Sequence, residues 1–292
     1  MKIVPKGILS IKWRGKGMGR LIVSDLKKLV KCRTVWVCAV ISFLVGMLMT
    51  FLYDMAWNNM SDTQNYQTVF YFMRTMGMDS DMTKQVLSQF PSQVFWQYVN
   101  TLLSDGNIVI FAAIVISVYI GSEYNEGTFK NTLSRGFSRT SVYISKYISS
   151  VLAMAITVLS YVFGGGIVAA IKFDLTTDVS DEEMIIMVLA YSALFIALTA
   201  VFMLIATLSK RTGFAIALSI VIPIIVSLIV RILSVGFDWV TNAASYWIFD
   251  TVTLVSTLYQ NSDIYIPFMV APIYLVLSLA VGMFAFSRQE IK

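Results

Sequence analysis

The sequence predicts an all-α integral membrane protein with six transmembrane helices. Hydrophobic residues make up 57% of the chain and charged residues only 13%, whereas soluble domains carry about 25% charged residues. The mean hydropathy is +0.74, and the apolar residues are gathered into six long runs. Because one spanning helix takes about 20 residues, the 292 residues accommodate one bundle with its loops, and we predict a single transmembrane domain over 1–292.

Each of the six runs is long enough, or nearly so, to cross the hydrocarbon core of a bilayer, which is about 30 Å thick. The second is the shortest, and we expect it to extend by about a turn at either end. The predicted spans are residues 34–53, 107–122, 147–171, 184–208, 213–235 and 266–287.

The charge distribution predicts that both termini are cytoplasmic. Residues 1–33 contain ten Lys and Arg against one acid, Asp25. Most of the remaining basic residues follow the second, fourth and sixth runs, and most acids lie in the other connections. Basic loops stay in the cytoplasm, and an even number of spans returns the chain to the side on which it began.

The segment 17–33 is predicted to form an amphipathic elbow helix before the first span. Lys and Arg occupy one side of it, and apolar residues recur at helical spacing on the other. Such a helix lies in the inner interface with its basic side chains toward anionic lipid. It serves either as a simple anchor or also as a contact for a cytoplasmic partner, and the two are compatible. The apolar residues are Met18, Leu21, Ile22, Leu26, Leu29 and Val30.

Two further segments are expected on the outer face. The long extracellular loop 54–106 has helical apolar spacing over 82–104, so we expect one or two short helices there. They form a passive cap or take part in substrate gating and release. The segment 236–265 is too short to cross twice, and a single crossing would move the basic tail outside. We therefore expect a re-entrant hairpin or an interfacial helix.

The segment 123–145 between the second and third spans has the most specific pattern. The span ends at an acid pair, Glu123 and Glu126. Gly127 allows a turn that a side chain would hinder, and Thr128 is the predicted N-cap of a short helix. An ordinary cytoplasmic loop would explain the basic residues but not the acids followed by Gly-Thr.

The predicted short helix is marked at both ends. Phe129 and Leu133 are four residues apart and share one face. Arg135 and Gly136 supply a basic last turn and a glycine stop. A short capped helix with both signs of charge is suited to a groove on a soluble partner.

This segment resembles the coupling-helix region of ATP-binding-cassette (ABC) exporter permeases of the second membrane-domain type. That family often shows an E–GT–K–L–(S)RG–(S)R pattern between its second and third spans. The resemblance implies that a separate ATPase subunit contacts the segment, with the loop after the fourth span, Lys210 and Arg211, as a second cytoplasmic contact. The residues implied in ATPase coupling are Glu123, Glu126, Gly127, Thr128, Phe129, Lys130, Leu133, Arg135 and Arg139.

The resemblance also implies an assembly of two permeases, as a homodimer, with two ATPases that bind ATP and Mg²⁺. The nearest relatives look like small Gram-positive peptide-toxin exporters and bacteriocin-immunity permeases. They imply a bacterial cell membrane and an amphipathic or hydrophobic cargo, such as a peptide toxin or antimicrobial peptide. The long first outer loop departs from many members. The alternatives are a non-transporting scaffold or sensor, and a sodium or drug exporter of the same fold.

The chain has no G-x-x-x-x-G-K-[ST] motif and no hydrolase signature, and it has no histidine. Cys32 and Cys38 are six residues apart and so face different directions on a helix, which disfavours a disulfide or a metal pair. We therefore expect no enzyme activity, cofactor or metal in this chain. The expected partners are the ATPase, a second permease and membrane lipid, but not nucleic acid.

Four residues interrupt the third and fifth spans: Gly164, Gly165, Gly166 and Pro223. They indicate either close helix packing and kinks or hinge points for opening the dimer.

Overall fold

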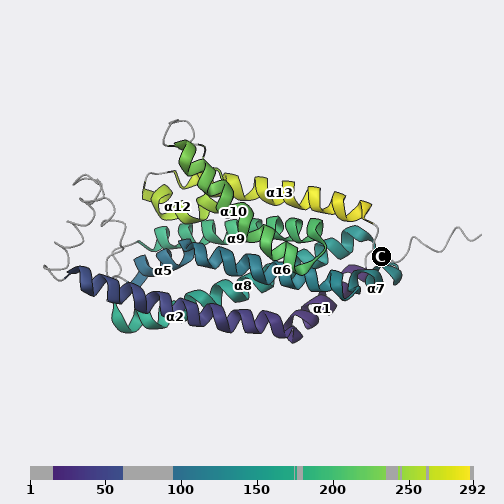
Figure 1. Cartoon of the computed structure of the whole chain (residues 1–292), viewed down its shortest axis with the longest axis horizontal. Helices are drawn as coiled ribbons and strands as arrows, with labels where there is room; N and C mark the ends of the chain where they lie inside the picture. Colours follow the sequence, from purple (N-terminus) through teal and green to yellow (C-terminus); the bar gives the residue numbers. More distant parts are fainter. Residues whose placement is uncertain are drawn as a thin grey trace, which may run out of the picture.

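The computed structural model describes residues 16–61, 95–173, 175, 180–234, 243, 245–260 and 263–289. Within these ranges the chain folds into ten α-helices and contains no strand. The helices lie roughly side by side along the long axis of the molecule (Figure 1).

Six of the helices are long and apolar enough to cross a membrane, as the sequence predicts. The second span ends three residues beyond the apolar run, close to the expected turn, but begins only one residue before it, at Gly106. The six are α2 (Arg33–Ser61), α6 (Gly106–Asn125), α8 (Arg139–Lys172), α9 (Asp181–Ser209), α10 (Thr212–Ser234) and α13 (Tyr265–Arg288).

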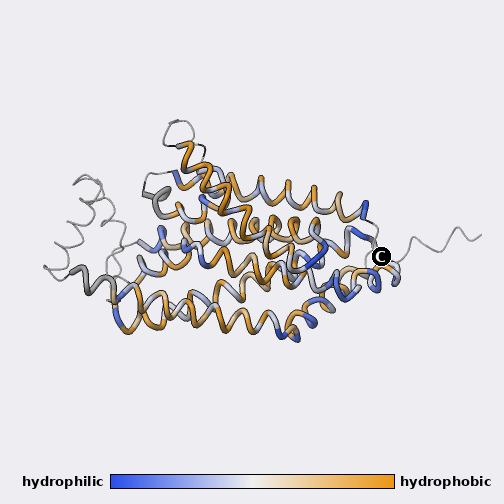
Figure 2. The backbone as a smooth tube through the Cα atoms, in the orientation of Figure 1, coloured by the Kyte–Doolittle hydropathy of each residue, from blue (hydrophilic) through white to orange (hydrophobic). Residues whose placement is uncertain are grey.

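The core of the bundle lies between α6, α8 and α9. Ile116 of α6, Met154 of α8 and Phe202 of α9 are almost wholly buried. α2 packs mainly on α8, α13 on α9, and α10 on α6. The middle of the bundle is hydrophobic and its two ends are hydrophilic (Figure 2).

α2 and α8 approach each other closely at glycines. A Cβ atom on Gly164 would lie 2.2 Å from the carbonyl oxygen of Phe43, and one on Gly165 would lie 2.8 Å from Thr50 Oγ1, also in α2. Nothing lies within 4 Å of the same position on Gly166. Small residues allow membrane helices to pack closely, so Gly164 and Gly165 have a packing role. A hinge at these glycines stays a prediction.

Pro223 lies inside α10 and is buried. Proline cannot donate the backbone hydrogen bond to the residue four positions earlier, here Ser219. The Ser219 side chain is a separate contact: its hydroxyl accepts a hydrogen bond from Ser117 of α6 at 3.0 Å. A hinge at Pro223 also stays a prediction.

α1 (Lys16–Lys31) is the amphipathic helix that precedes the first span. Leu21 and Leu29 are buried on its apolar face, which packs against α8. Cys32 lies between α1 and α2. Cys32 and Cys38 are both free thiols.

α5 (Phe95–Ser104) and α12 (Ile248–Gln260), which belong to the two segments expected on the outer face, lie at the same end of the bundle (Figure 1). α2 continues to Ser61, beyond the expected start of the loop, and α5 (Phe95–Ser104) is one short helix within it. Residues 62–94 of that loop lie outside the described residues. α12 (Ile248–Gln260) has 13 residues, about 20 Å of helix, which is too short to cross the membrane.

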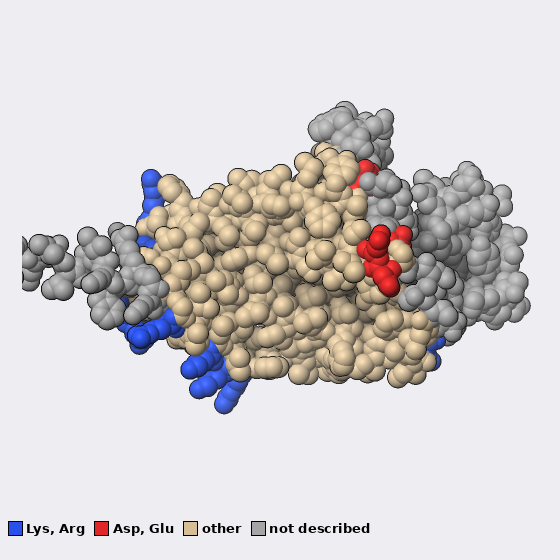
Figure 3. All heavy atoms as spheres, turned by 180° about the vertical axis from the view of Figure 1, so that it is seen from behind, with Lys and Arg blue, Asp and Glu red and all other residues tan. Residues whose placement is uncertain are grey.

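Charge is divided between the two ends of the bundle. On the face shown in Figure 3, Lys and Arg gather at one end and Asp and Glu at the other, with an almost uncharged belt between them. Exposed residues of the basic end include Arg135 and Arg211, and those of the acidic end include Asp181 and Glu182. Near the acidic end, Lys172 pairs with Asp54, with Nζ 3.2 Å from Oδ2.

Candidate functional site: the α7 end of the bundle

The short helix α7 (Thr128–Ser134) lies at the basic end of the bundle. We call this the α7 end; it also includes α1, the end of α6, the start of α8, the turn between α9 and α10, and the end of α13. Figure 1 shows α1, α7 and the end of α13 together at this end. It contains the whole segment that the sequence predicts to be a coupling loop.

The turn into α7 depends on a glycine. Gly127 has φ +65°, a left-handed conformation that side chains disfavour. Gly127 is also the N-cap of α7, so the prediction that Thr128 is the N-cap is wrong. The reason is that the Thr128 hydroxyl donates backward, to the carboxylate and to the carbonyl oxygen of Glu123, instead of accepting from an amide of α7.

The predicted end of α7 is confirmed. Arg135 is the C-cap, and Gly136 has φ +86°, as a glycine stop requires. Ser138 then caps α8 by accepting a hydrogen bond from the Ser141 amide at 3.2 Å. α8 therefore begins at Arg139, well before the predicted start of the third span at residue 147.

Aromatic packing anchors one face of α7 to the bundle. Phe129 is 2% exposed, and its ring centroid lies 4.6 Å from that of Tyr124 in α6 and 5.2 Å from that of Phe286 in α13. Tyr143 of α8 also packs against Phe286, with ring centroids 5.8 Å apart. Leu133 is half-buried on the same face. A displacement of α7 would therefore also displace side chains of α6 and α13, and through Phe286 those of α8.

Arg139 joins the start of α8 to the end of α13. Its Nη1 atom donates to the carbonyl oxygens of Phe286 at 3.0 Å, Ser287 at 3.0 Å and Gln289 at 2.6 Å. These carbonyls have no partner within the helix, and a cation there is favoured by the helix dipole. The Gln289 side chain in turn donates to the carbonyl oxygen of Thr207 in α9 at 2.9 Å.

A buried ionic cluster formed by Asp25, Glu123 and Lys146 lies behind α7. The Nζ atom of Lys146 is 2.8 Å from Asp25 Oδ1 and 2.8 Å from Glu123 Oε1. The Lys146 side chain is 1% exposed, and those of Asp25 and Glu123 are 2% and 9% exposed. Ser145 donates to the second oxygen of Asp25 at 2.5 Å, and Lys146 lies 5.7 Å from the ring centroid of Tyr119.

The ionic cluster connects four helices. Asp25 lies on α1, Glu123 on α6 and Lys146 on α8, while Thr128 adds α7 through its bond to Glu123. Lys28 of α1 lies 3.9 Å from Glu123 Oε1. Buried charges must be paired because desolvation is costly, so these contacts hold the elbow helix and the coupling segment in one arrangement.

Sequence reasoning missed Asp25 and Lys146 as site residues. The missing signal was the position of Asp25 between Leu21 and Leu29, four residues from each, on the apolar face of α1. A carboxylate on a face that becomes buried requires a cation as partner.

The outward surface of α7 is polar and carries both signs of charge. We call it the coupling surface; its exposed residues are Glu126, Lys130, Asn131, Ser134 and Arg135. Among the predicted coupling residues, Glu123 and Phe129 instead point into the bundle and Arg139 contacts α13. The predicted residues thus divide into a surface that a partner can reach and a set that positions α7.

The turn between α9 and α10 lies beside this region. Asn125 of α6 donates to Thr212 Oγ1 at 2.9 Å, and a Cβ atom on Gly121 would lie 2.7 Å from Thr212 Cα. Lys210 and Arg211 are exposed in the turn, and Lys210 has φ +56°. The structure therefore brings the predicted second contact next to the end of α6.

Comparison with known families agrees with this architecture. The model of a family described as ABC-2 family transporter protein matches residues 21–291, a range that includes α7 and all six spanning helices. No curated protein sequence matches the chain. In this family the membrane subunit is not itself the catalyst, and an ATPase partner is implied. The chain therefore belongs to the ABC-2 family and is a membrane permease subunit of an ABC transporter.

Proposed function

We propose that this permease belongs to an ATP-driven exporter and that the coupling surface of α7 receives the ATPase subunit. One observation carries the proposal: α7 exposes a polar face while its other face is fixed to α6 and α13 through Phe129. A helix held in this way passes a displacement on to the bundle instead of absorbing it. Lys210 and Arg211 form the second contact.

ATP and Mg²⁺ belong to the ATPase partner, and this chain supplies the contact and the connection to the membrane. Glu123, Phe129 and Arg139 act through the position of α7. The α7 end is cytoplasmic in this proposal, because basic ends of membrane proteins stay inside. Both termini of the chain are then cytoplasmic, and the membrane is that of a bacterial cell.

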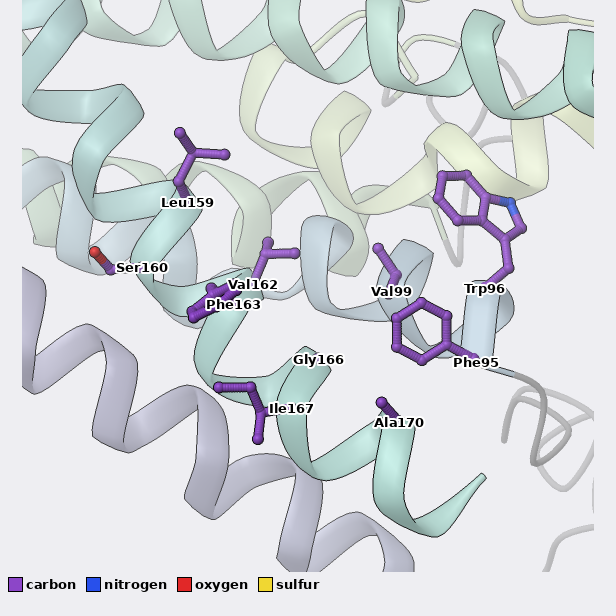
Figure 4. Close-up of a pocket in the computed structure, with 10 residues that line it drawn as sticks. All are labelled: Phe95, Trp96, Val99, Leu159, Ser160, Val162, Phe163, Gly166, Ile167 and Ala170. Carbon is purple, nitrogen blue, oxygen red and sulfur yellow. The ribbon is translucent and has the colours of Figure 1, made fainter. Parts of the chain in front are cut away.

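The proposed cargo is amphipathic or hydrophobic, such as a peptide toxin or antimicrobial peptide. A hollow of about 780 Å³ lies between α5 and α8, and Phe95, Val99, Phe163 and Ile167 are among the residues that line it (Figure 4). Its lining is almost wholly apolar, and such a lining suits the hydrophobic face of a cargo molecule better than an ion.

The proposed assembly is a homodimer with two ATPases. α10 is the least buried of the six spanning helices, and it exposes an apolar row at helical spacing. A second permease, together with lipid, would cover this row. The exposed residues are Val221, Ile224, Ile225, Leu228, Ile229 and Ile232.

Co-purification of the chain with its ATPase, in mild detergent, tests the coupling surface. The double variant Lys130→Glu with Arg135→Glu reverses two exposed charges on α7. We expect at least a tenfold loss of ATPase affinity, about 1.4 kcal/mol, and loss of permease-dependent ATP hydrolysis. The control, Lys27→Glu with Lys31→Glu, reverses two exposed charges on α1 and should keep most of the binding.

Equal ATPase binding by the two double variants would contradict the coupling surface. A native preparation that contains no ATPase at all would favour the scaffold or sensor. The cargo is tested separately, by the ATPase activity of the assembled complex in liposomes. An amphipathic peptide should stimulate hydrolysis, whereas stimulation by sodium or a small drug alone would favour the other exporters of this fold.

A further inference from the structure

We propose that a pocket between α1 and α7 binds the phosphate group of an anionic phospholipid. The pocket has a volume of about 410 Å³. α1 contributes Arg20 and Lys28, and α7 and its C-cap contribute Asn131 and Arg135. The elbow helix and the coupling helix would then share one lipid headgroup.

The three cations of this pocket have little internal counter-charge. No carboxylate of the described ranges pairs with Arg20 or Arg135. Lys28 reaches Glu123 only at 3.9 Å. Asp25 is the one acid in the lining, and it is 2% exposed. A pocket that gathers three cations in this way is suited to an anion.

Asp25 does not act as the counter-ion of Arg20 or Arg135, because its two carboxylate oxygens already have other partners. One lies 2.8 Å from Lys146 Nζ, and the other accepts from Ser145. The ionic cluster holds two carboxylates and one ammonium group, and its one excess negative charge faces Lys28, which lies 3.9 Å from Glu123 Oε1. The pocket therefore keeps an excess of positive charge, and Arg20 and Arg135 are left for a ligand. Ser24 and Asn131 are exposed beside them and can donate further hydrogen bonds.

Phosphate is the anion that this arrangement favours. The planar guanidinium groups of Arg20 and Arg135 can each present two parallel N–H donors to phosphate oxygens. Lys28 adds a point charge to the same lining. Basic pockets between helices on the cytoplasmic side of a membrane bind phospholipid headgroups in the same way.

The position of the pocket favours a phosphate that is attached to a lipid. α1 is amphipathic and lies where the hydrophobic belt of the bundle gives way to its hydrophilic end (Figure 2), which is the depth of lipid phosphates. Leu21, which is buried, and Phe137, which is half-buried, also line the pocket. They offer apolar contact to the glycerol and acyl part of a lipid. A free phosphate has no such part and would gain nothing from these two residues.

Lipid retention by the purified full chain, measured by native mass spectrometry, tests this site without the ATPase. Its outcome is therefore independent of the proposed export function. Short-chain phosphatidylglycerol, phosphatidylcholine of the same chain length and inorganic phosphate are the three probes. We expect the wild type to bind phosphatidylglycerol at least tenfold more tightly than the other two.

Two matched triple variants distinguish the pocket from general attraction. Arg20→Gln, Lys28→Gln and Arg135→Gln remove its three cations, and we expect at least a tenfold loss of phosphatidylglycerol affinity. The control triple, Lys27→Gln, Lys31→Gln and Arg33→Gln, removes three exposed cations from the same region that do not line the pocket. It should change the affinity less than threefold. All six side chains are exposed, so both variants should fold.

Three results would overturn the proposal. An equal loss in both triple variants would mean unspecific attraction to a basic surface. Inorganic phosphate that binds as tightly as phosphatidylglycerol would mean a free anion site. Unchanged lipid binding by the pocket variant, together with loss of ATPase co-purification, would mean that these cations serve the protein partner.

Discussion

Lys146 and Asp25 are 121 residues apart in the sequence, yet Lys146 Nζ lies 2.8 Å from Asp25 Oδ1 and both side chains are almost wholly buried. The pair fixes the elbow helix α1 against α8. Because Lys146 also contacts Glu123 at 2.8 Å, the same ammonium group holds the end of α6. One cation therefore sets the mutual position of three helices that surround α7.

Substitution of Lys146 by Met should be strongly destabilising. It would leave the carboxylates of Asp25 and Glu123 buried without their main cation, and breaking a buried pair in this way costs about 3–5 kcal/mol. Thermal unfolding in detergent would show a clear drop in Tm. The matched control is Lys172→Met. Lys172 is 44% exposed although its partner Asp54 is buried, at 7%, so we expect a smaller drop in Tm than for Lys146→Met, where the cation and both carboxylates are buried.

The lost stability should be recovered when the carboxylates are neutralised as well. The triple variant Lys146→Met, Asp25→Asn and Glu123→Gln should unfold at a higher temperature than Lys146→Met alone, because uncharged amides cost less to bury. If the triple variant is no more stable than Lys146→Met, then Lys146 does not stabilise the protein by balancing the charges of Asp25 and Glu123.

Thr128→Val should loosen α7 without unfolding the bundle. The Thr128 hydroxyl donates to the Glu123 side chain and backbone, and its loss leaves a buried acceptor less satisfied, at about 1–3 kcal/mol. Hydrogen exchange of the α7 amides should become faster. Thr132→Val is the control, since that hydroxyl bonds only to the Thr128 carbonyl within the helix; equal exchange in both variants would refute the role of Thr128.

Gly164→Ala should push α2 away from α8. The new Cβ atom would lie 2.2 Å from the Phe43 carbonyl oxygen, and such overpacking costs about 1–3 kcal/mol. Gly166→Ala meets nothing within 4 Å and should stabilise the helix by up to about 1 kcal/mol. The two Tm values test the packing role. A Gly166→Ala protein that is stable but inactive in transport would support the hinge instead.

Arg139→Gln should free the last turn of α13. The guanidinium donates to three carbonyl oxygens there, and hydrogen bonds of a charged group are worth about 1.5–3 kcal/mol. Amide exchange near Phe286 should rise, as read by mass spectrometry of peptides from α13. Arg288→Gln removes a cation that lies over the Phe284 ring at 4.3 Å and should leave this exchange nearly unchanged.

The six spans, α1 and the C-terminal end of α7 could be predicted because each depends on local signals. An apolar run of about 20 residues spans a membrane wherever it lies, and Gly136 stops a helix by its own conformational freedom. The start of α8 could not be found in this way. The stretch from Arg139 to Lys146 is polar enough to resemble a loop, and it is helical because Tyr143 and Lys146 have partners on α13 and α1.

The N-cap of α7 and the ionic cluster were not predicted for a related reason. Thr128 has the right residue type for an N-cap, but a carboxylate five positions earlier competes for its hydroxyl. Asp25 and Lys146 were each assigned to basic cytoplasmic segments from their neighbours in the sequence. Only the packing of α1 on α8 brings them together, and no local pattern contains that contact.

The continuity of α8 makes it a lever. Its 34 residues run without a break from Arg139 beside α7 to Lys172 at the other end of the bundle, about 51 Å of helix. A tilt of about five degrees around the α7 end would displace the far end by about 4 Å at that length. The far part of α8 lines the apolar hollow, so a small rotation at the α7 end would shift one wall of that hollow by a much larger distance.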